Sequence, residues 1–258
     1  MSMSSTAKSL SVRDQVSEAE WQTRVDLAAC YRLIAMHGWD DLVFTHISAR
    51  VPGPEEHFLI NAYGLLFEEM SASSLVKVDL NGNQVLKSPY MINPAGFTIH
   101  SAIHEARHDV ACVIHTHTKA GVAVSAQTDG LLPLSQVSLF PLASIAYHDY
   151  EGVALNEEEK PRLVADLGDR SNLILRNHGL LTAAASIPDA FLSMYVLETA
   201  CQTQVLAQSA GVPLTSISKQ ILAGIKAQAE AVTKGLGGKL AWPGLLRKLD
   251  RHDSSFRN

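Results

Sequence analysis

The sequence has little of what marks secreted or nucleic-acid-binding proteins. Its 258 residues include three cysteines, Cys30, Cys112 and Cys201, an odd number set far apart in apolar segments. Such cysteines are typical of a reduced protein without disulfides. The formal net charge is -5, so the chain lacks the basic surplus that binds nucleic acid or an anionic membrane. We therefore expect a cytoplasmic protein with neither nucleic acid nor a membrane among its partners.

We also expect neither a secretory leader nor a membrane-spanning run. The first ten residues have no apolar core that could serve as a signal peptide, and we expect residues 1–16 to form a disordered lead-in. No formally charged residue occurs over 130–148. Pro133, Pro141 and several serines interrupt this stretch too often for a spanning helix. The stretch therefore predicts buried loop and strand.

What the sequence does contain is an alternation of helical and strand-like patterns. S17-E-A-E20 has the spacing of a capping box and Gly38 is a helix stop, so we expect a first helix over 17–37. V76-K-V-D-L80 followed by N81-G82 predicts a hairpin that continues over 84–86. Further strands are predicted at 44–51, 58–61, 110–115 and 173–176, and further helices at 97–107, 119–126, 157–167, 188–208 and 217–232.

These elements form no internal repeat and are joined by no long linker. The simplest arrangement is one α/β domain over 17–240 with a C-terminal tail over 241–258. Both ends of the chain are the parts least expected to be ordered alone.

Two histidines sit one residue apart in I114-H-T-H-T118, at the end of an apolar run. On a strand, the side chains of His115 and His117 would point to the same face, about 6.5 Å apart, where they could hold one metal ion. Chance is a rival interpretation, because about half of one such pair is expected at random in a chain of this histidine content.

A third histidine follows another predicted strand, in L173-I-L-R-N-H-G-L180. Here Gly179 lets the chain turn sharply after His178. Three histidines with an open fourth position are typical of catalytic zinc, whereas closed structural sites use mainly thiolates. Because no cysteine lies near another in the sequence, His178 is a candidate third ligand. The alternative, strand-end histidines that only form hydrogen bonds at a rim, stays open.

Other histidines allow two interpretations each. His100, His104 and His108 recur every four residues and line one helical face, which is either functional or simply solvated. His46, in F44-T-H-I-S-A-R50, lies on a predicted strand and faces either a pocket or water.

The two histidine segments, with F58-L-I-N-A-Y-G-L-L-F67 and Y147-H-D-Y-E-G152, make residues 21–208 resemble the class II aldolase and adducin family. The resemblance implies one three-layer α/β/α domain around a mostly antiparallel mixed sheet, and a homotetramer with active sites between subunits. It places His115, His117 and His178 at the ligand positions for zinc or another divalent metal. In the family's sugar-phosphate aldolases the ion chelates two substrate oxygens and stabilises the enediolate left when a carbon–carbon bond breaks.

The sequence departs from those aldolases where they bind phosphate and move the proton. His46 stands in T45-H-I-S48, where the aldolases carry Gly-Asn-x-Ser, and takes the place of the asparagine. P94-A-G96 stands where the aldolases carry two serines and a glutamate, so the usual glutamate position is Gly96. Neither the phosphate-binding hydroxyls nor the acid/base carboxylate is present, which places the sequence nearer the adducin-like branch.

The residues left in these positions define the expected substrate contacts. Gly64 is retained, but Tyr63 before it is bulkier than usual, which indicates a differently shaped pocket. We expect a small non-phosphorylated substrate to contact His46, Tyr63, Gly64 and Ala95. The proton carrier would be Tyr63, His46 or a water on the ion.

Two functional hypotheses follow. The first is a metal-dependent class II aldolase-like lyase or isomerase that stabilises an enediolate of a small hydroxy- or keto-substrate, by aldol cleavage or decarboxylation. The second is a non-catalytic adducin-like metal-binding or assembly module that has lost the catalytic glutamate. Binding to actin or spectrin is not expected, because R247-K-L-D-R-H-D-S-S-F-R-N258 is not the long lysine-rich tail of cytoskeletal adducins.

Overall fold

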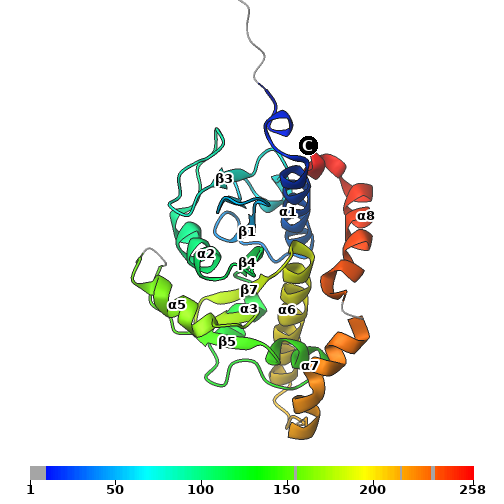
Figure 1. Ribbon diagram of the computed structural model, residues 1–258. Coiled ribbons are helices and arrows are strands. Elements are labelled where there is room, and N and C mark those ends of the chain that lie inside the picture. Colours follow the sequence, from blue (N-terminus) through cyan, green and yellow to red (C-terminus); the bar gives the residue numbers. More distant parts are fainter. Residues whose placement is uncertain (1–9, 154–155, 216, 234–235) are drawn as a thin grey trace, which may run out of the picture.

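A computed structural model describes residues 10–153, 156–215, 217–233 and 236–258 (Figure 1). The first nine residues of the expected lead-in lie outside the described residues. Within the rest of it, Arg13–Gln15 form a short 3-10 helix, η1, which precedes the first α-helix, α1 (Glu18–Met36). The three cysteines are buried and form no disulfide, in agreement with the sequence-based expectation.

The centre of the fold is a seven-stranded sheet with the order β3-β2-β1-β4-β7-β6-β5. Only β5 and β6 are parallel, and the other neighbouring pairs are antiparallel, which confirms the mostly antiparallel mixed sheet. The strands are β1 (His46–Arg50), β2 (Phe58–Ile60), β3 (Val76–Val78), β4 (Cys112–Thr116), β5 (Ile145–His148), β6 (Asn172–Leu175) and β7 (Gly179–Ala184).

Helices cover both faces of the sheet, which confirms the three-layer α/β/α arrangement (Figure 1). On one face lie α1 (Glu18–Met36), α3 (Lys119–Ser125), α4 (Gln136–Leu142) and α6 (Ile187–Ser209). On the other face lie α2 (Pro94–Ala106) and α5 (Glu159–Leu167). Each face has its own buried apolar cluster, the larger one under α1 and α6.

The first helix follows its sequence signals closely. The hydroxyl of Ser17 accepts a hydrogen bond from the Glu20 amide at 3.1 Å, and Gly38 ends the helix with a φ of +68°. The second half of the expected capping box is not formed. The Glu20 carboxylate instead accepts from the buried guanidinium of Arg24 at 3.0 Å and from Lys77 at 2.8 Å. One local and one long-range ion pair therefore take the place of the backbone hydrogen bond that a capping box would form.

Three other expectations need correction. The stretch 130–148 was expected to be loop and strand, but it also contains the helix α4, whose N-cap is Ser135. The strand in this stretch is β5. The hairpin after β3 has its turn, but its second strand is reduced to one bridge, between Val78 and Gln84. Strand β7, which directly follows His178, was not anticipated from the sequence.

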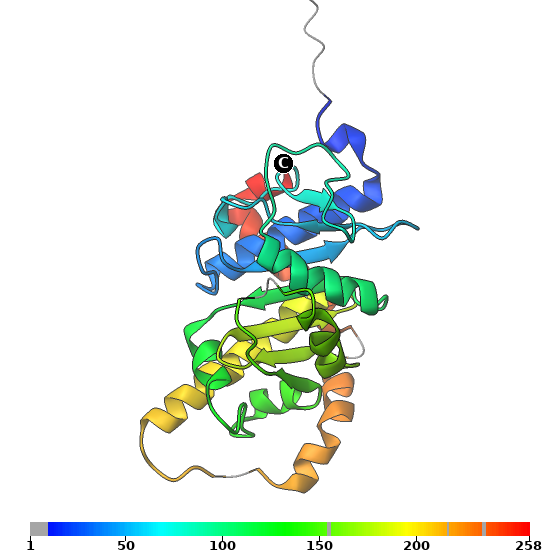
Figure 2. The same cartoon turned by 90° about the vertical axis from the view of Figure 1, so that its left-hand side faces the viewer.

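The C-terminal part of the chain is helical and returns to the domain (Figures 1 and 2). It consists of α7 (Lys219–Thr233), η3 (Gly237–Leu240), α8 (Trp242–His252) and η4 (Ser254–Arg257). Residues 241–258, which the sequence analysis set aside as a tail, pack along α1. The indole of Trp242 donates to Asp26 at 2.9 Å, and Phe256 is fully buried.

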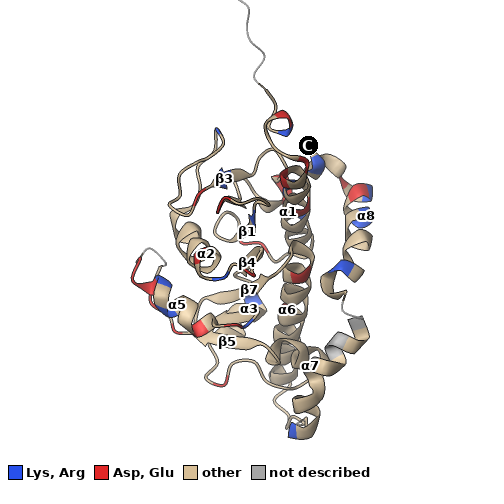
Figure 3. Ribbon diagram, viewed as in Figure 1, with Lys and Arg blue, Asp and Glu red and all other residues tan. Residues whose placement is uncertain are grey.

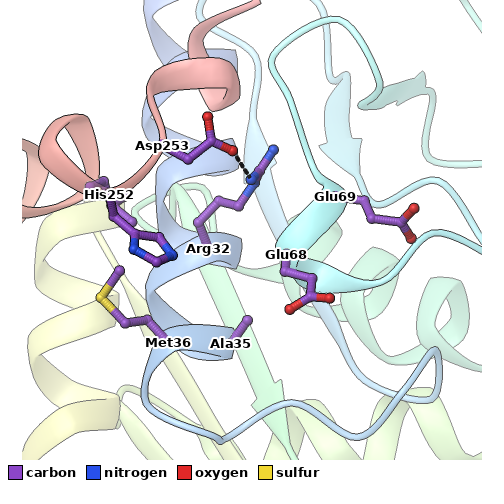
Figure 4. Close-up of a pocket in the computed structure, with 8 residues that line it drawn as sticks. Arg32, Ala35, Met36, Glu68, Glu69, His252 and Asp253 are labelled. Atoms are coloured by element: carbon purple, nitrogen blue, oxygen red, sulfur yellow. Dashed lines mark hydrogen bonds and ion pairs between the residues drawn. The ribbon is translucent and has the colours of Figure 1, made fainter.

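The contact between α1 and α8 encloses a cavity of about 350 Å³. Figure 4 shows Arg32 reaching the Asp253 carboxylate there, at 3.0 Å, with Glu68 nearby on η2 (Phe67–Glu69). This cavity shares no lining residue with the histidine cavity described below. Its arginine is engaged in holding the C-terminal segment on α1.

Charged residues are interspersed along the chain, and α5 and α8 carry both signs (Figure 3). Among the helices of the described ranges, none is long and apolar enough to cross a membrane.

Candidate metal centre

Three histidines from two chain segments converge at the ends of the central strands β4 and β7. His115 is on β4, His117 follows the end of that strand, and His178 lies in the turn between β6 and β7. Strands β4 and β7 are neighbours, and Thr116 pairs with Leu180, so the sheet register brings the two segments together. One ligand nitrogen from each ring lies within 4.8 Å of the others. The sequence analysis predicted that these three side chains lie close together, and in the structure they do.

Hydrogen bonds on the outer nitrogens determine which atoms face the centre. The Nδ1–H of His115 donates to the carbonyl oxygen of Leu180 at 3.0 Å, and the Nδ1–H of His117 donates to the carboxylate of Asp41 at 3.0 Å. Both acceptors can only accept, so in the neutral rings each Nε2 carries a lone pair. These two Nε2 atoms are 2.9 Å apart. A cation between them would relieve the repulsion of their lone pairs.

The donor set fits a divalent metal such as zinc. Burial, followed by the charges of neighbouring histidines, lowers the pKa of His115 well below its usual range and that of His178 to about 4. Both rings are therefore neutral near neutral pH, which is the form that binds metal. Nitrogens around a tetrahedral zinc are about 3.3 Å apart, so binding requires only a small opening of the 2.9 Å contact.

Asp41 was not anticipated from the sequence. It lies in the loop after α1, and its carboxylate orients the ring of His117. Carboxylates that accept from a ligand histidine are common around metal ions, because they fix the ring and make it a better donor. The only available signal was a pair of acids, Asp40 and Asp41, 74 residues or more before the His-x-His segment. Such spacing carries no information without the fold.

The turn that carries His178 differs from its expected form. The residue in the left-handed region is Asn177, with a φ of +57°, whereas Gly179 has no positive φ. Gly179 is instead required by a close approach: a Cβ there would lie 2.4 Å from the carbonyl oxygen of Thr116. Because this glycine allows the ends of β4 and β7 to meet, it also sets the separation of His117 and His178.

His46 lies beside the centre, on β1 and in register with His115. The two rings are stacked, with centroids 6.1 Å apart. The Asn93 side-chain oxygen accepts from the Ala95 amide at 3.1 Å, so its nitrogen is free to donate to His46 Nε2 at 3.0 Å. His46 therefore carries its proton on Nδ1, which is buried and has no partner among the described residues. Burial lowers its pKa to about 3, so the ring is neutral.

Gly96 lies behind this ring. A Cβ on Gly96 would be 2.4 Å from both Cγ and Cδ2 of His46, a distance that real Cβ atoms do not reach. The imidazole thus occupies the volume that any side chain at position 96 would need.

A cavity of about 500 Å³ opens over the histidines. His46, Tyr63 and Ala95, which the sequence analysis named as substrate contacts, line this cavity, and their contact with a substrate stays a prediction. Gly64 is exposed and is not among the lining residues, and Gly96 is covered by His46. Lining residues that the sequence did not suggest are Asp41, Phe44, Asn93, Ile99, Tyr150, Gly152 and Val153.

The family profile described as the Class II Aldolase and Adducin N-terminal domain matches residues 25–205. The chain belongs to the class II aldolase and adducin family.

Two relatives and one solved structure illustrate the range of the family. A putative aldolase class 2 protein of Pseudomonas aeruginosa is 64% identical over 249 residues, which cover 95% of this chain and 96% of that protein. Alpha-adducin of Rattus norvegicus is 49% identical over 193 residues, 73% of this chain but only 26% of the adducin. The crystal structure of an aldolase II superfamily protein from Pseudomonas syringae is 53% identical, with a TM-score of 0.92 over 96% of this chain and 99% of that one.

In this class II aldolase and adducin domain, the histidine stripe of α2 is neither solvated nor directed into the cavity. The hydroxyl of Ser48 contacts His100 Nδ1 at 2.6 Å and His104 Nε2 at 2.8 Å, and all three side chains are buried. The third member, His108, lies beyond the end of the helix and is exposed, 3.2 Å from Glu56. A solvated helical face was therefore the wrong expectation for the first two.

Proposed function

We propose that the protein is a metal-dependent lyase or isomerase of the class II aldolase type, with zinc or another divalent ion held by His115, His117 and His178. The observation that carries this is the pair of Nε2 atoms 2.9 Å apart, each left with a lone pair because its Nδ1 is engaged elsewhere. Family membership supports it. The reaction is aldol cleavage or decarboxylation of a small hydroxy- or keto-substrate.

A divalent ion held by the three histidines would supply Lewis-acid stabilisation of negative charge that develops on the substrate oxygens. The chain's own residues bind and orient the substrate and move the proton. With Gly96 at the glutamate position, Tyr63 and His46 are the proposed acid/base groups, and both line the cavity. The Nε2 of His46 already accepts from Asn93, and the Nδ1–H of the same ring is buried, so His46 would need Asn93 to move before it could exchange a proton with the substrate. The Tyr63 hydroxyl is the proposed proton carrier.

A non-phosphorylated substrate is supported by the charges around the cavity. Among the described residues that line it, none is Lys or Arg, and its acid, Asp41, is engaged by His117. Recognition of a phosphate dianion normally uses Arg, Lys or a helix N-terminus. The N-terminus of α2 borders this cavity, but its Ala95 amide already donates to the side-chain oxygen of Asn93 at 3.1 Å. We also propose a cytoplasmic homo-oligomer, with a tetramer as the arrangement that the family implies, to be checked by measuring the solution mass.

The decisive experiment is metal analysis of protein prepared without chelators. About one divalent ion per subunit is expected, and His115→Ala combined with His178→Ala should abolish it. His108→Ala, which changes an exposed histidine, serves as the control and should retain the metal. Chelator-free protein without any divalent ion would refute the proposal.

The similarity to alpha-adducin favours a second candidate, a non-catalytic metal-binding or assembly module. The lyase or isomerase would convert a substrate to product, whereas the module would bind ligands without converting them. Metal-loaded protein would be screened against small keto-acids, hydroxy-acids and sugars, first by thermal shift and then for product formation. Ligand stabilisation without turnover by any member of the screen would favour the module.

A further inference from the structure

We infer that the substrate carries an apolar substituent of about phenyl size next to its chelating oxygens, and that Phe44, Tyr150 and Val153 contact it. This inference rests on the proposed function, because the chelating oxygens require the ion. It adds a class of substrate: small hydroxy- or keto-compounds with an aromatic or branched aliphatic group, in place of polyhydroxylated sugar phosphates.

The first support is the exposure of the three side chains. Phe44 is 51%, Tyr150 55% and Val153 70% exposed, and all three line the histidine cavity. Single exposed apolar residues are common on protein surfaces, but several gathered at one concave site mark a binding surface. Ile99, which is buried, adds an apolar wall to the same cavity.

The second support is the position of the aromatic rings relative to the ligand histidines. The Phe44 amide donates to the carbonyl oxygen of Asp41 at 2.9 Å, and the side chain of Asp41 orients His117. Tyr150 stands edge-on to His178, with ring centroids 6.3 Å apart. One aromatic ring thus stands beside a ligand histidine, and the backbone of a second aromatic residue is held by the residue that orients another. A molecule chelated at the centre would extend past Tyr150 into the cavity that Phe44 also lines.

The third support is the sign of the nearby charges. Asp149 and Glu151 flank Tyr150 in the loop before α5, which Figure 3 draws with acidic segments. Glu151 is paired with Arg162, so that arginine is not free for a ligand. No Lys or Arg is among the described lining residues, and the Ala95 amide at the N-terminus of α2 is already bonded to the Asn93 side chain. These features disfavour a dianionic group and favour an uncharged one.

The test compares three hydroxamates, which share one chelating group, on zinc-loaded protein by calorimetry. Acetohydroxamate has a methyl tail, benzohydroxamate a phenyl tail, and phosphonoacetohydroxamate an anionic tail. We expect benzohydroxamate to bind about tenfold more tightly than acetohydroxamate, because its ring would leave water for an apolar wall. The phosphonate should not bind more tightly than acetohydroxamate.

Two variants then locate the effect. Phe44→Ala and Tyr150→Ala should each reduce the ratio of the benzohydroxamate to the acetohydroxamate affinity. Both side chains are half-exposed, so the fold should tolerate these changes, which circular dichroism would check. Leu206→Ala, an equally apolar change at a 71% exposed position of α6, is the matched control and should leave the ratio as it is.

The outcomes separate the two levels of the argument. Equal affinities, or preference for the phosphonate, would overturn the apolar substituent while leaving the metal centre in place. If the protein cannot be loaded with zinc and none of the three hydroxamates binds, both the apolar substituent and the metal centre would be overturned. A lower solution mass for Phe44→Ala or Tyr150→Ala, with an unchanged affinity ratio, would identify the rim as a contact with a second copy and overturn the inference.

Discussion

The imidazole of His46 fills the space that a side chain at position 96 would take. A Cβ on Gly96 would lie 2.4 Å from two carbons of that ring. In the sequence, the histidine at 46 and the glycine at 96 are two separate departures from the family's aldolases. In the structure they form one packing unit, because the ring of His46 in this position requires glycine at 96.

Gly96→Ala should therefore destabilise the protein by about 1–3 kcal/mol, the usual range for overpacking a well-packed interior. Removing the ring should relieve this cost, so His46→Ala and Gly96→Ala together should cost less than the sum of the single changes. Urea unfolding of the four proteins of this cycle measures the coupling. Gly224→Ala, where the new Cβ meets only the far end of Gln228 at 3.4 Å, is the control and should not destabilise. Strict additivity of the two changes would contradict the packing unit.

Asp41→Ala should weaken binding of the divalent ion by about 10- to 100-fold, because His117 loses the carboxylate that orients it. Asp41→Asn keeps an oxygen that can accept from Nδ1 and should recover part of the affinity. Competition with a chromogenic chelator measures both. Asp40→Ala alters the neighbouring acid, whose carboxylate makes no hydrogen bond to a histidine of the centre among the described residues. An equal loss for Asp40→Ala would show that overall charge, and not ring orientation, is responsible.

Gly179→Ala should reduce metal affinity although residue 179 supplies no ligand. Its Cβ would be 2.4 Å from the Thr116 carbonyl oxygen, and backbone cannot yield as a flexible side chain can. The ends of β4 and β7 would have to separate, which would move His117 away from His178. The control is Asn177→Gly in the same turn, which removes a side chain at a φ of +57° and should leave metal binding intact. Full metal content in Gly179→Ala would disprove the role of the close approach.

The free energy of unfolding should decrease as the pH is lowered below about 6.5, because buried histidines stay neutral in the folded protein. Burial, assisted by the charge of Arg50, lowers the pKa of His104 from 6.5 to about 3. Above pH 6.5 the ring is neutral in both states, so the full stability is present. Below pH 6.5, His104 in the unfolded chain binds a proton that it does not bind in the folded protein. This lowers the free energy of unfolding by up to about 1.4 kcal/mol per pH unit.

Urea unfolding between about pH 7 and about pH 5 tests this dependence. His104→Leu should flatten the slope by about one proton, whatever its effect on stability at neutral pH. His108→Asn, at a position whose side chain is 72% exposed, should leave the slope as it is. A slope that does not change in His104→Leu would mean that this ring is not the one that resists protonation.

Local signals located many of the elements but not their interactions. Ser17 and Gly38 predicted α1 to within one residue at each end, because caps act over three or four residues of chain. The same kind of signal was present at Ser135, yet α4 was missed, since its charge-free sequence and Pro141 looked like loop. Strand β7 was missed because its sequence, G179-L-L-T-A-A184, shows no alternation and contains a single β-branched residue.

The sequence by itself determined the family, the fold class and the three histidines. These are encoded in contiguous segments whose residue types and spacing are visible without the fold. Only the tertiary structure decided how they act together. Asp41 reaches His117, and His46 excludes a side chain at 96, across separations of 76 and 50 residues. Such pairs arise from strand register and loop packing, and no short-range pattern in the chain records them.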